Sequence, residues 1–85
     1  MPVKVGQRFV LRGSLAQVVL SYAVSEPGYW TIQEIIEDID QKQTSVVENV
    51  RSLKRRNMIL QKEDRIYPTE IGKIALMKSM RLLTG

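Results

Sequence analysis

The sequence predicts a mainly helical domain with a small β-hairpin, an α+β fold, and three observations support this. Three stretches after residue 14 repeat apolar residues at helical spacing, and each begins with a Ser or Thr that can cap a helix. Two short runs that contain apolar residues, 58–60 and 65–67, are separated by four polar residues and predict the hairpin. A length of 85 residues suits a single domain, which we place at 1–85.

The three helix starts share one pattern, in which a Ser or Thr lies three residues before a Gln or Glu. In such a capping box the hydroxyl accepts a hydrogen bond from the first turn, and the longer side chain reaches back to the cap. The pairs are Ser14 with Gln17, Thr31 with Glu34, and Ser45 with Glu48. They predict a first helix that ends in the turn 25–28, a second helix over 32–39 and a third over 45–56.

The remaining segments are shorter. Alternating apolar residues predict an extended arm or strand over 1–12, and the aromatic pair 29–30 can form a brief strand. The hairpin occupies 58–68, with a turn between its two apolar runs. Thr69 can cap a final helix, which we place at 69–84.

The final helix is apolar over more than one stripe, which indicates that it buries two faces. One face can pack on the domain and the other on a second copy. We therefore expect a homodimer formed through this helix. The candidate contact residues are Leu76, Met80 and Leu83. Alternatively, the N-terminal arm covers the second face within a monomer.

Charge is distributed unevenly along the chain, whose net charge is +4. Residues 1–42 carry four basic and five acidic residues, whereas residues 43–85 carry nine basic and four acidic ones. A basic half beside a nearly neutral half predicts one surface that faces a polyanion.

Several classes of function are disfavoured by what the sequence lacks. It has no histidine and no cysteine, which removes the commonest general base and the usual metal ligands. It also has no glycine-rich phosphate loop, so we expect neither an enzyme nor a cofactor, metal or effector site. The longest apolar run is four residues, 74–77, so we expect no membrane span and place the chain in the cytoplasm or on the nucleoid.

Residues 31–57 are the segment most informative about function. A short apolar helix, the turn 40–43 and a longer helix are the parts of a helix-turn-helix, in which the first helix braces the second against DNA. A hairpin directly after the second helix makes the arrangement a winged helix, with 58–68 as the wing.

This segment resembles a known family. The winged helix-turn-helix pattern of prokaryotic transcription regulators is similar to TIQEIIEDIDQKQTSVVENVRSLKRRNMI, and the likeness covers residues 31 to about 72. The start of the post-wing helix in regulators of the multiple-antibiotic-resistance-repressor type resembles YPTEIGK. The resemblance implies a winged-helix regulator that binds double-stranded DNA. Asp40 and Asn57 depart from the family, which usually has Gly at both turns, but both residue types tolerate left-handed backbone.

Helical spacing divides the third helix into an inward side, with Val46, Val50 and Leu53, and an outward side. The N-terminal residues of such a helix reach base edges, whereas cations at its far end are better placed for phosphates. The base-reading candidates are Gln43, Thr44, Ser45, Glu48 and Asn49. The phosphate candidates are Arg51, Ser52, Arg55 and Arg56. The wing candidates, for contact near the minor groove, are Lys62 and Arg65.

Plainer alternatives stand beside these assignments. Glu48 can simply complete its own capping box, and Arg51 and Arg55 can form an ordinary solvated face. The leading hypothesis is a sequence-preferring double-stranded DNA-binding protein, most simply a small transcription regulator. The alternative is a winged helix used for protein contact, or a DNA-binding subunit of replication or partition machinery.

Overall fold

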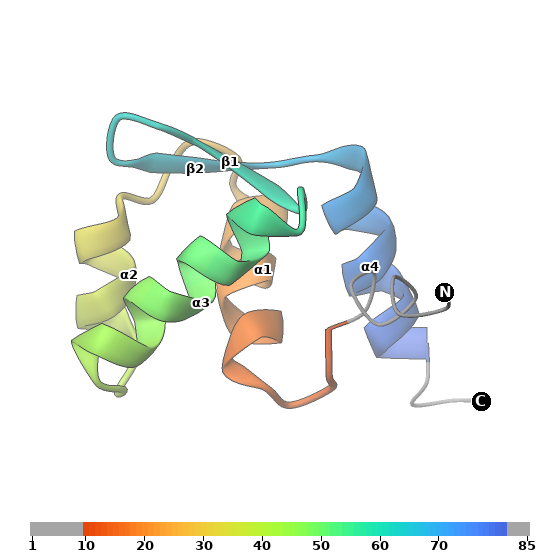
Figure 1. Cartoon of the computed structure of the whole chain (residues 1–85), viewed down its shortest axis with the longest axis horizontal. Helices are drawn as coiled ribbons and strands as arrows, with labels where there is room; N and C mark the ends of the chain where they lie inside the picture. Colours follow the sequence, from red (N-terminus) through yellow and green to blue (C-terminus); the bar gives the residue numbers. More distant parts are fainter. Residues whose placement is uncertain (1–9, 82–85) are drawn as a thin grey trace.

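The protein's structure is a computed structural model that describes residues 10–81, apart from the side chain of Arg81. The described part contains four helices and one antiparallel two-stranded hairpin, which confirms the expected mainly helical α+β class (Figure 1). The elements are α1 (Leu15–Ser25), α2 (Ile32–Asp38), α3 (Gln43–Arg55), β1 (Ile59–Lys62), β2 (Arg65–Pro68) and α4 (Glu70–Arg81). Most of the expected N-terminal arm, residues 1–9, lies outside the described residues.

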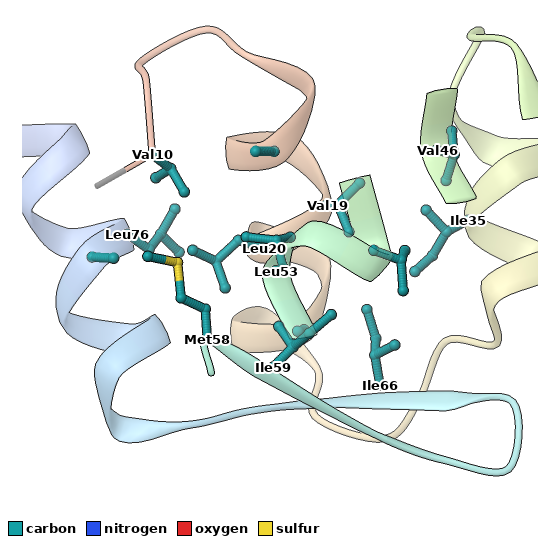
Figure 2. Close-up of a cluster of buried hydrophobic side chains, with 14 residues drawn as sticks. Val10, Val19, Leu20, Ile35, Val46, Leu53, Met58, Ile59, Ile66 and Leu76 are labelled. Atoms are coloured by element: carbon teal, nitrogen blue, oxygen red, sulfur yellow. The ribbon is translucent and has the colours of Figure 1, made fainter. Parts of the chain in front are cut away.

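Helix α1 lies at the centre of the fold, between α2 at one end and α4 at the other (Figure 1). Its residues Val19, Leu20 and Ala23 are fully buried. Figure 2 shows side chains from the other helices and the hairpin gathered around it. The buried cluster is Val10, Ala16, Val19, Leu20, Ala23, Ile35, Val46, Val50, Leu53, Met58, Ile59, Ile66, Ala75 and Leu76. Because every element contributes to this cluster, one core fixes where all of them lie.

Two of the expected helix caps are present. Ser14 caps α1 by accepting a hydrogen bond from the N–H of Gln17 (3.2 Å). The Gln17 side chain reaches back to the N–H of Gly13 (2.8 Å), one residue earlier than expected. At α2, Thr31 and Glu34 form both hydrogen bonds of the capping box. These caps satisfy backbone donors that a helix start otherwise leaves unpaired.

The start of α3 differs from the expectation. The helix begins at Gln43 and follows Lys42, whose side chain makes no capping hydrogen bond. The N–H of Val46 donates to the carbonyl of Lys42 (3.1 Å), which winds the intervening residues into the first helical turn. Ser45 therefore lies within the helix, and the expected capping box between Ser45 and Glu48 was wrong.

Helix α3 ends in a left-handed turn at Asn57, where φ is 63°, as the sequence predicts. The N–H of Asn57 donates to the carbonyl of Lys54, and the N–H of Met58 to that of Leu53, both at 2.9 Å. This pair of bonds is a Schellman motif, which satisfies the last carbonyls of the helix. Asp40 is not among the described residues with positive φ, so the turn before α3 does not use the left-handed backbone that Asp would tolerate.

The hairpin is tighter than expected. Lys62 pairs with Arg65, so the turn contains only residues 63–64. The brief strand expected at 29–30 is absent from the described structure; instead Thr31 makes a single bridge to Arg65. This bridge places the hairpin beside the start of α2.

Helix α4 begins against the end of α3. The Thr69 hydroxyl donates to the carbonyl of Asn57 (2.6 Å) and accepts from the N–H of Gly72 (3.0 Å), so Thr69 caps α4 as expected. The N–H of Thr69 also donates to the carbonyl of Met58 (3.1 Å). A Cβ atom at Gly72 would lie only 2.0 Å from the same carbonyl oxygen. The glycine of the YPTEIGK stretch therefore permits α4 to approach the start of the hairpin.

Candidate nucleic-acid interface

The outward side of α3 carries most of the residues assigned to DNA. On the inward side, Val46, Val50 and Leu53 are each 3% exposed or less. The opposite side of the helix presents exposed side chains, which are Thr44, Glu48, Arg51 and Arg55. The division into a core side and an outward side is thus the one that helical spacing predicts.

A shallow, open depression runs along this outward side. Its lining residues are Glu48, Asn49, Arg51, Ser52 and Arg55, which brings base-reading and phosphate candidates together. Two exposed guanidinium groups on a concave polar surface suit an anion such as phosphate, because a guanidinium can donate two parallel hydrogen bonds to it.

The base-reading candidates differ in accessibility. Gln43 and Thr44 are exposed in the first turn of α3, whereas Ser45 and Asn49 are half-buried. The Asn49 amide donates to the carbonyl of Ser45 within the same helix (2.8 Å). That bond uses one of the two N–H donors of the amide and ties the side chain to its own helix, so bidentate recognition of adenine would require the side chain to turn outward. Glu48 is exposed and has no capping role, so its carboxylate faces outward among the arginines.

The phosphate candidates also fall into two groups. Arg51 and Arg55 are exposed, whereas Ser52 and Arg56 are half-buried. Arg56 occupies the C-terminal cap position of α3, at the far end from the base-reading candidates. Arg55 and its neighbour Lys54 lie in the last turn, where cations stabilise the negative end of the helix dipole. Part of this basic cluster therefore has a structural explanation as well.

Two side-chain bridges hold the hairpin beside α2 and α3. The Lys54 ammonium donates to the Gln61 side-chain carbonyl (2.6 Å), which joins α3 to β1. Arg65 Nη1 donates to the carbonyls of Gly28 (3.2 Å) and Tyr29 (2.7 Å) in the turn before α2. Arg65 is therefore an anchor of the hairpin. Sequence reasoning missed this role because the two carbonyls lie 36 and 37 residues away along the chain.

Lys62, the other wing candidate, is more accessible. It is exposed at the end of β1, and its ammonium lies 5.5 Å from the centre of the Tyr67 ring. Such a cation–π contact is weak at an exposed site, so the ammonium can still bind a second partner.

The three residues expected in a dimer contact have different surroundings. Leu76 is 7% exposed and belongs to the core, so its assignment to a partner surface was wrong. Met80 is 52% exposed, and Leu83 lies outside the described residues. Ile74 and Met77 are 46% and 53% exposed and share the outward side of α4 with Met80. We call Ile74, Met77 and Met80 the α4 stripe.

Comparison with models of protein families, with curated proteins and with solved structures found no match. Within residues 10–81, no helix is both long and apolar enough to span a bilayer. No cluster of three or more His, Cys, Asp or Glu that could hold a metal ion occurs in the same part of the chain.

Proposed function

We propose that this chain is a winged helix-turn-helix protein that binds double-stranded DNA, with α3 as the recognition helix in the major groove. The observation that carries the proposal is the exposed pair Arg51 and Arg55 in the polar depression of α3. The order of α2, a short turn, α3 and a hairpin supports it, because this is the order in a winged helix.

The two ends of α3 would have different roles on DNA. Its 13 residues span a length of about 20 Å, and an α-helix is narrow enough to enter the major groove. Gln43 and Thr44, exposed at the N-terminal end, would read base edges, and Arg51 and Arg55 would bind phosphates. Lys62 at the end of the hairpin would approach the backbone or the minor groove.

A small transcription regulator is the simplest protein with this activity, and it would act on the nucleoid in the cytoplasm. Binding alone suffices for that role, so the proposal includes no catalysis and no cofactor. A second copy on the α4 stripe is part of the proposal, since exposed methionine and isoleucine side chains favour a partner over water.

The test is the salt dependence of binding to a short duplex, measured for the wild type and for Arg51→Ala/Arg55→Ala. Each phosphate contact adds about 0.9 to the slope of log K against log salt, so the variant's slope should be smaller by about 1.8. Affinity should fall similarly for all sequences. Arg12→Ala, at an exposed position before α1, is the control, because it removes a positive charge away from α3, the hairpin and α4, and its slope should stay close to that of the wild type. An unchanged slope in the α3 variant would reject the proposed DNA-facing side.

One observation favours the alternative of a winged helix that binds protein, or that serves replication or partition machinery. Glu48 is exposed in the middle of the outward side, and a carboxylate repels phosphate. Glu48→Gln should therefore strengthen binding to random duplex DNA if this side faces the phosphates. Absence of binding to random duplexes at low salt would favour the protein-contact alternative.

A further inference from the structure

The two ends of the molecule differ in chemistry. Helices α2 and α4 lie at opposite ends of the longest axis, which measures 34 Å (Figure 1). Helix α2 contains three acidic and no basic residues, whereas α4 contains three basic residues and one acidic residue. Neither end belongs to the outward side of α3, so both remain accessible when α3 is occupied.

The α2 end combines carboxylates with aromatic rings. A second depression there is lined by Tyr29, Trp30, Glu34, Glu37 and Asp38, which we call the acidic end. The Tyr29 side chain is 60% exposed, and its ring packs edge-to-face against Trp30 with centroids 5.5 Å apart. An exposed tyrosine ring and a half-buried tryptophan ring beside carboxylates fit a partner that offers both cations and apolar side chains.

The α4 end offers that combination. The α4 stripe presents aliphatic and thioether groups, and methionine sulfur packs favourably against aromatic rings. Lys73 and Lys78, both exposed, lie on the same outward side of α4. The α4 stripe and its lysines are thus complementary to the acidic end in both charge and apolar character.

We infer that copies of this chain associate head to tail, with the α4 stripe of one copy on the acidic end of the next. A symmetric contact of α4 with α4 would bring Lys73 and Lys78 of one copy close to the same two lysines of the other, and like charges repel. A head-to-tail contact pairs those lysines with carboxylates. A head-to-tail pair still has a free acidic end on one copy and a free α4 stripe on the other. Further copies can therefore join, and the contact extends into rows instead of closing as a dimer.

The behaviour that we expect of such rows on DNA rests on the proposed function. The 34 Å long axis matches one helical turn of B-DNA, about 34–36 Å or 10–10.5 base pairs. Copies in a row would therefore present successive α3 helices to the same side of the duplex. The contact is small and thus weak in solution, but neighbouring sites on DNA raise the local concentration of copies. Binding should be cooperative on direct repeats one turn apart.

The solution test uses two variants at exposed positions, Tyr29→Ala/Glu37→Lys at the acidic end and Met77→Ala/Lys78→Glu on α4. In sedimentation velocity up to about 1 mM, the wild type should associate beyond the dimer. Each variant alone should associate about tenfold more weakly. An equimolar mixture should recover a species that stops at the dimer, because it contains one intact contact. Glu63→Lys, which makes the same charge change at the hairpin turn, should behave as wild type.

A symmetric dimer gives different results, which would overturn the inference. The Tyr29→Ala/Glu37→Lys variant would then associate like the wild type, and the mixture would show no recovery. Failure of the wild type to associate both in solution and on repeated sites would also overturn it.

The DNA test compares a single site, direct repeats one turn apart, repeats offset by half a turn, and inverted repeats. Direct repeats in phase should bind the second copy about tenfold more tightly than a single site does, and the half-turn offset should abolish this gain. Cooperativity only on inverted repeats would overturn the head-to-tail contact in favour of a two-fold dimer. Single-site binding without cooperativity and without association in solution would reject this inference alone, whereas dimer recovery in solution without any DNA binding would reject only the proposed function.

Discussion

Replacing Gly72 by Ala should separate α4 from the end of α3, although alanine favours a helix. The added Cβ would lie 2.0 Å from the carbonyl oxygen of Met58, and contacts below 3.0 Å are essentially never formed. Helix α4 must therefore move by about 1 Å. This movement stretches two hydrogen bonds, from the Thr69 N–H to Met58 and from the Thr69 hydroxyl to Asn57.

The expected cost follows from these contributions. Two weakened hydrogen bonds cost about 2 kcal/mol together, and overpacking costs about 1–3 kcal/mol. The better helix propensity of alanine offsets about 1 kcal/mol, which leaves a net loss of about 2–4 kcal/mol. For a domain of this size, the midpoint of thermal unfolding should fall by about 10–30 °C.

Thermal unfolding followed by circular dichroism measures the effect. Gly13→Ala is a control for crowding, because an added Cβ at Gly13 meets no atom within 4 Å, although Gly13, unlike the helical Gly72, has a positive φ (81°). Its loss should be limited to the left-handed backbone, about 1–2 kcal/mol. A Gly72→Ala variant that unfolds at or above the wild-type temperature would refute the close approach of α4 to the hairpin.

Three further predictions concern stability. Thr31→Ala should lower the free energy of unfolding in urea by about 1 kcal/mol, because it removes a helix cap. Ser45→Ala should lower it by less than about 0.5 kcal/mol, because Ser45 caps no helix. Equal losses would indicate that Ser45 is a cap after all. Burial, then the hydrogen bond and charge of Asp38, raise the pKa of Tyr22 to about 12. The folded pKa lies above the unfolded value of about 10, so this stabilisation is complete below pH 10 and is lost as the pH rises toward 12. Tyr22→Phe should make unfolding less sensitive to pH between 10 and 12, and an unchanged pH profile would contradict the assignment. Asn57→Gly should leave the unfolding midpoint equal or higher, because glycine adopts positive φ without strain; a clear fall would indicate that the Asn side chain contributes a bond of its own.

Local features of the fold could be predicted because the interacting residues are close in sequence. The capping box of Thr31 and Glu34 spans three residues, and the left-handed turn at Asn57 depends on one residue type. The inward side of α3 follows from helical spacing alone. These features required no knowledge of which elements meet in space.

The failed expectations have identifiable physical causes. Ser45 had a competing helix start one turn earlier, and the bond from Val46 to Lys42 selected it. Leu76 and Met77 are adjacent on a helix that is apolar on two sides, so only packing against α1 decides which one is buried.

In the candidate interface, too, the sequence predicted the local features and missed those that depend on distant residues. The exposed positions of Arg51 and Arg55 follow from the buried positions of α3, whereas the anchoring role of Arg65 depends on a turn far away in the sequence. The internal hydrogen bond of Asn49 was equally hidden, because an Asn within a helix can bond its own backbone or face outward.

Tyr29 is shared by two surfaces. Its ring belongs to the acidic end, and its carbonyl accepts the hydrogen bond from Arg65 that holds the hairpin. A partner that shifts the backbone at Tyr29 must therefore also shift the anchor of the hairpin. Coupling between two binding sites is reciprocal. If a bound neighbour changes the affinity of the hairpin for DNA by some factor, bound DNA changes the affinity for that neighbour by the same factor. A single backbone carbonyl thus offers a route by which occupancy at one end of the molecule is communicated to the hairpin.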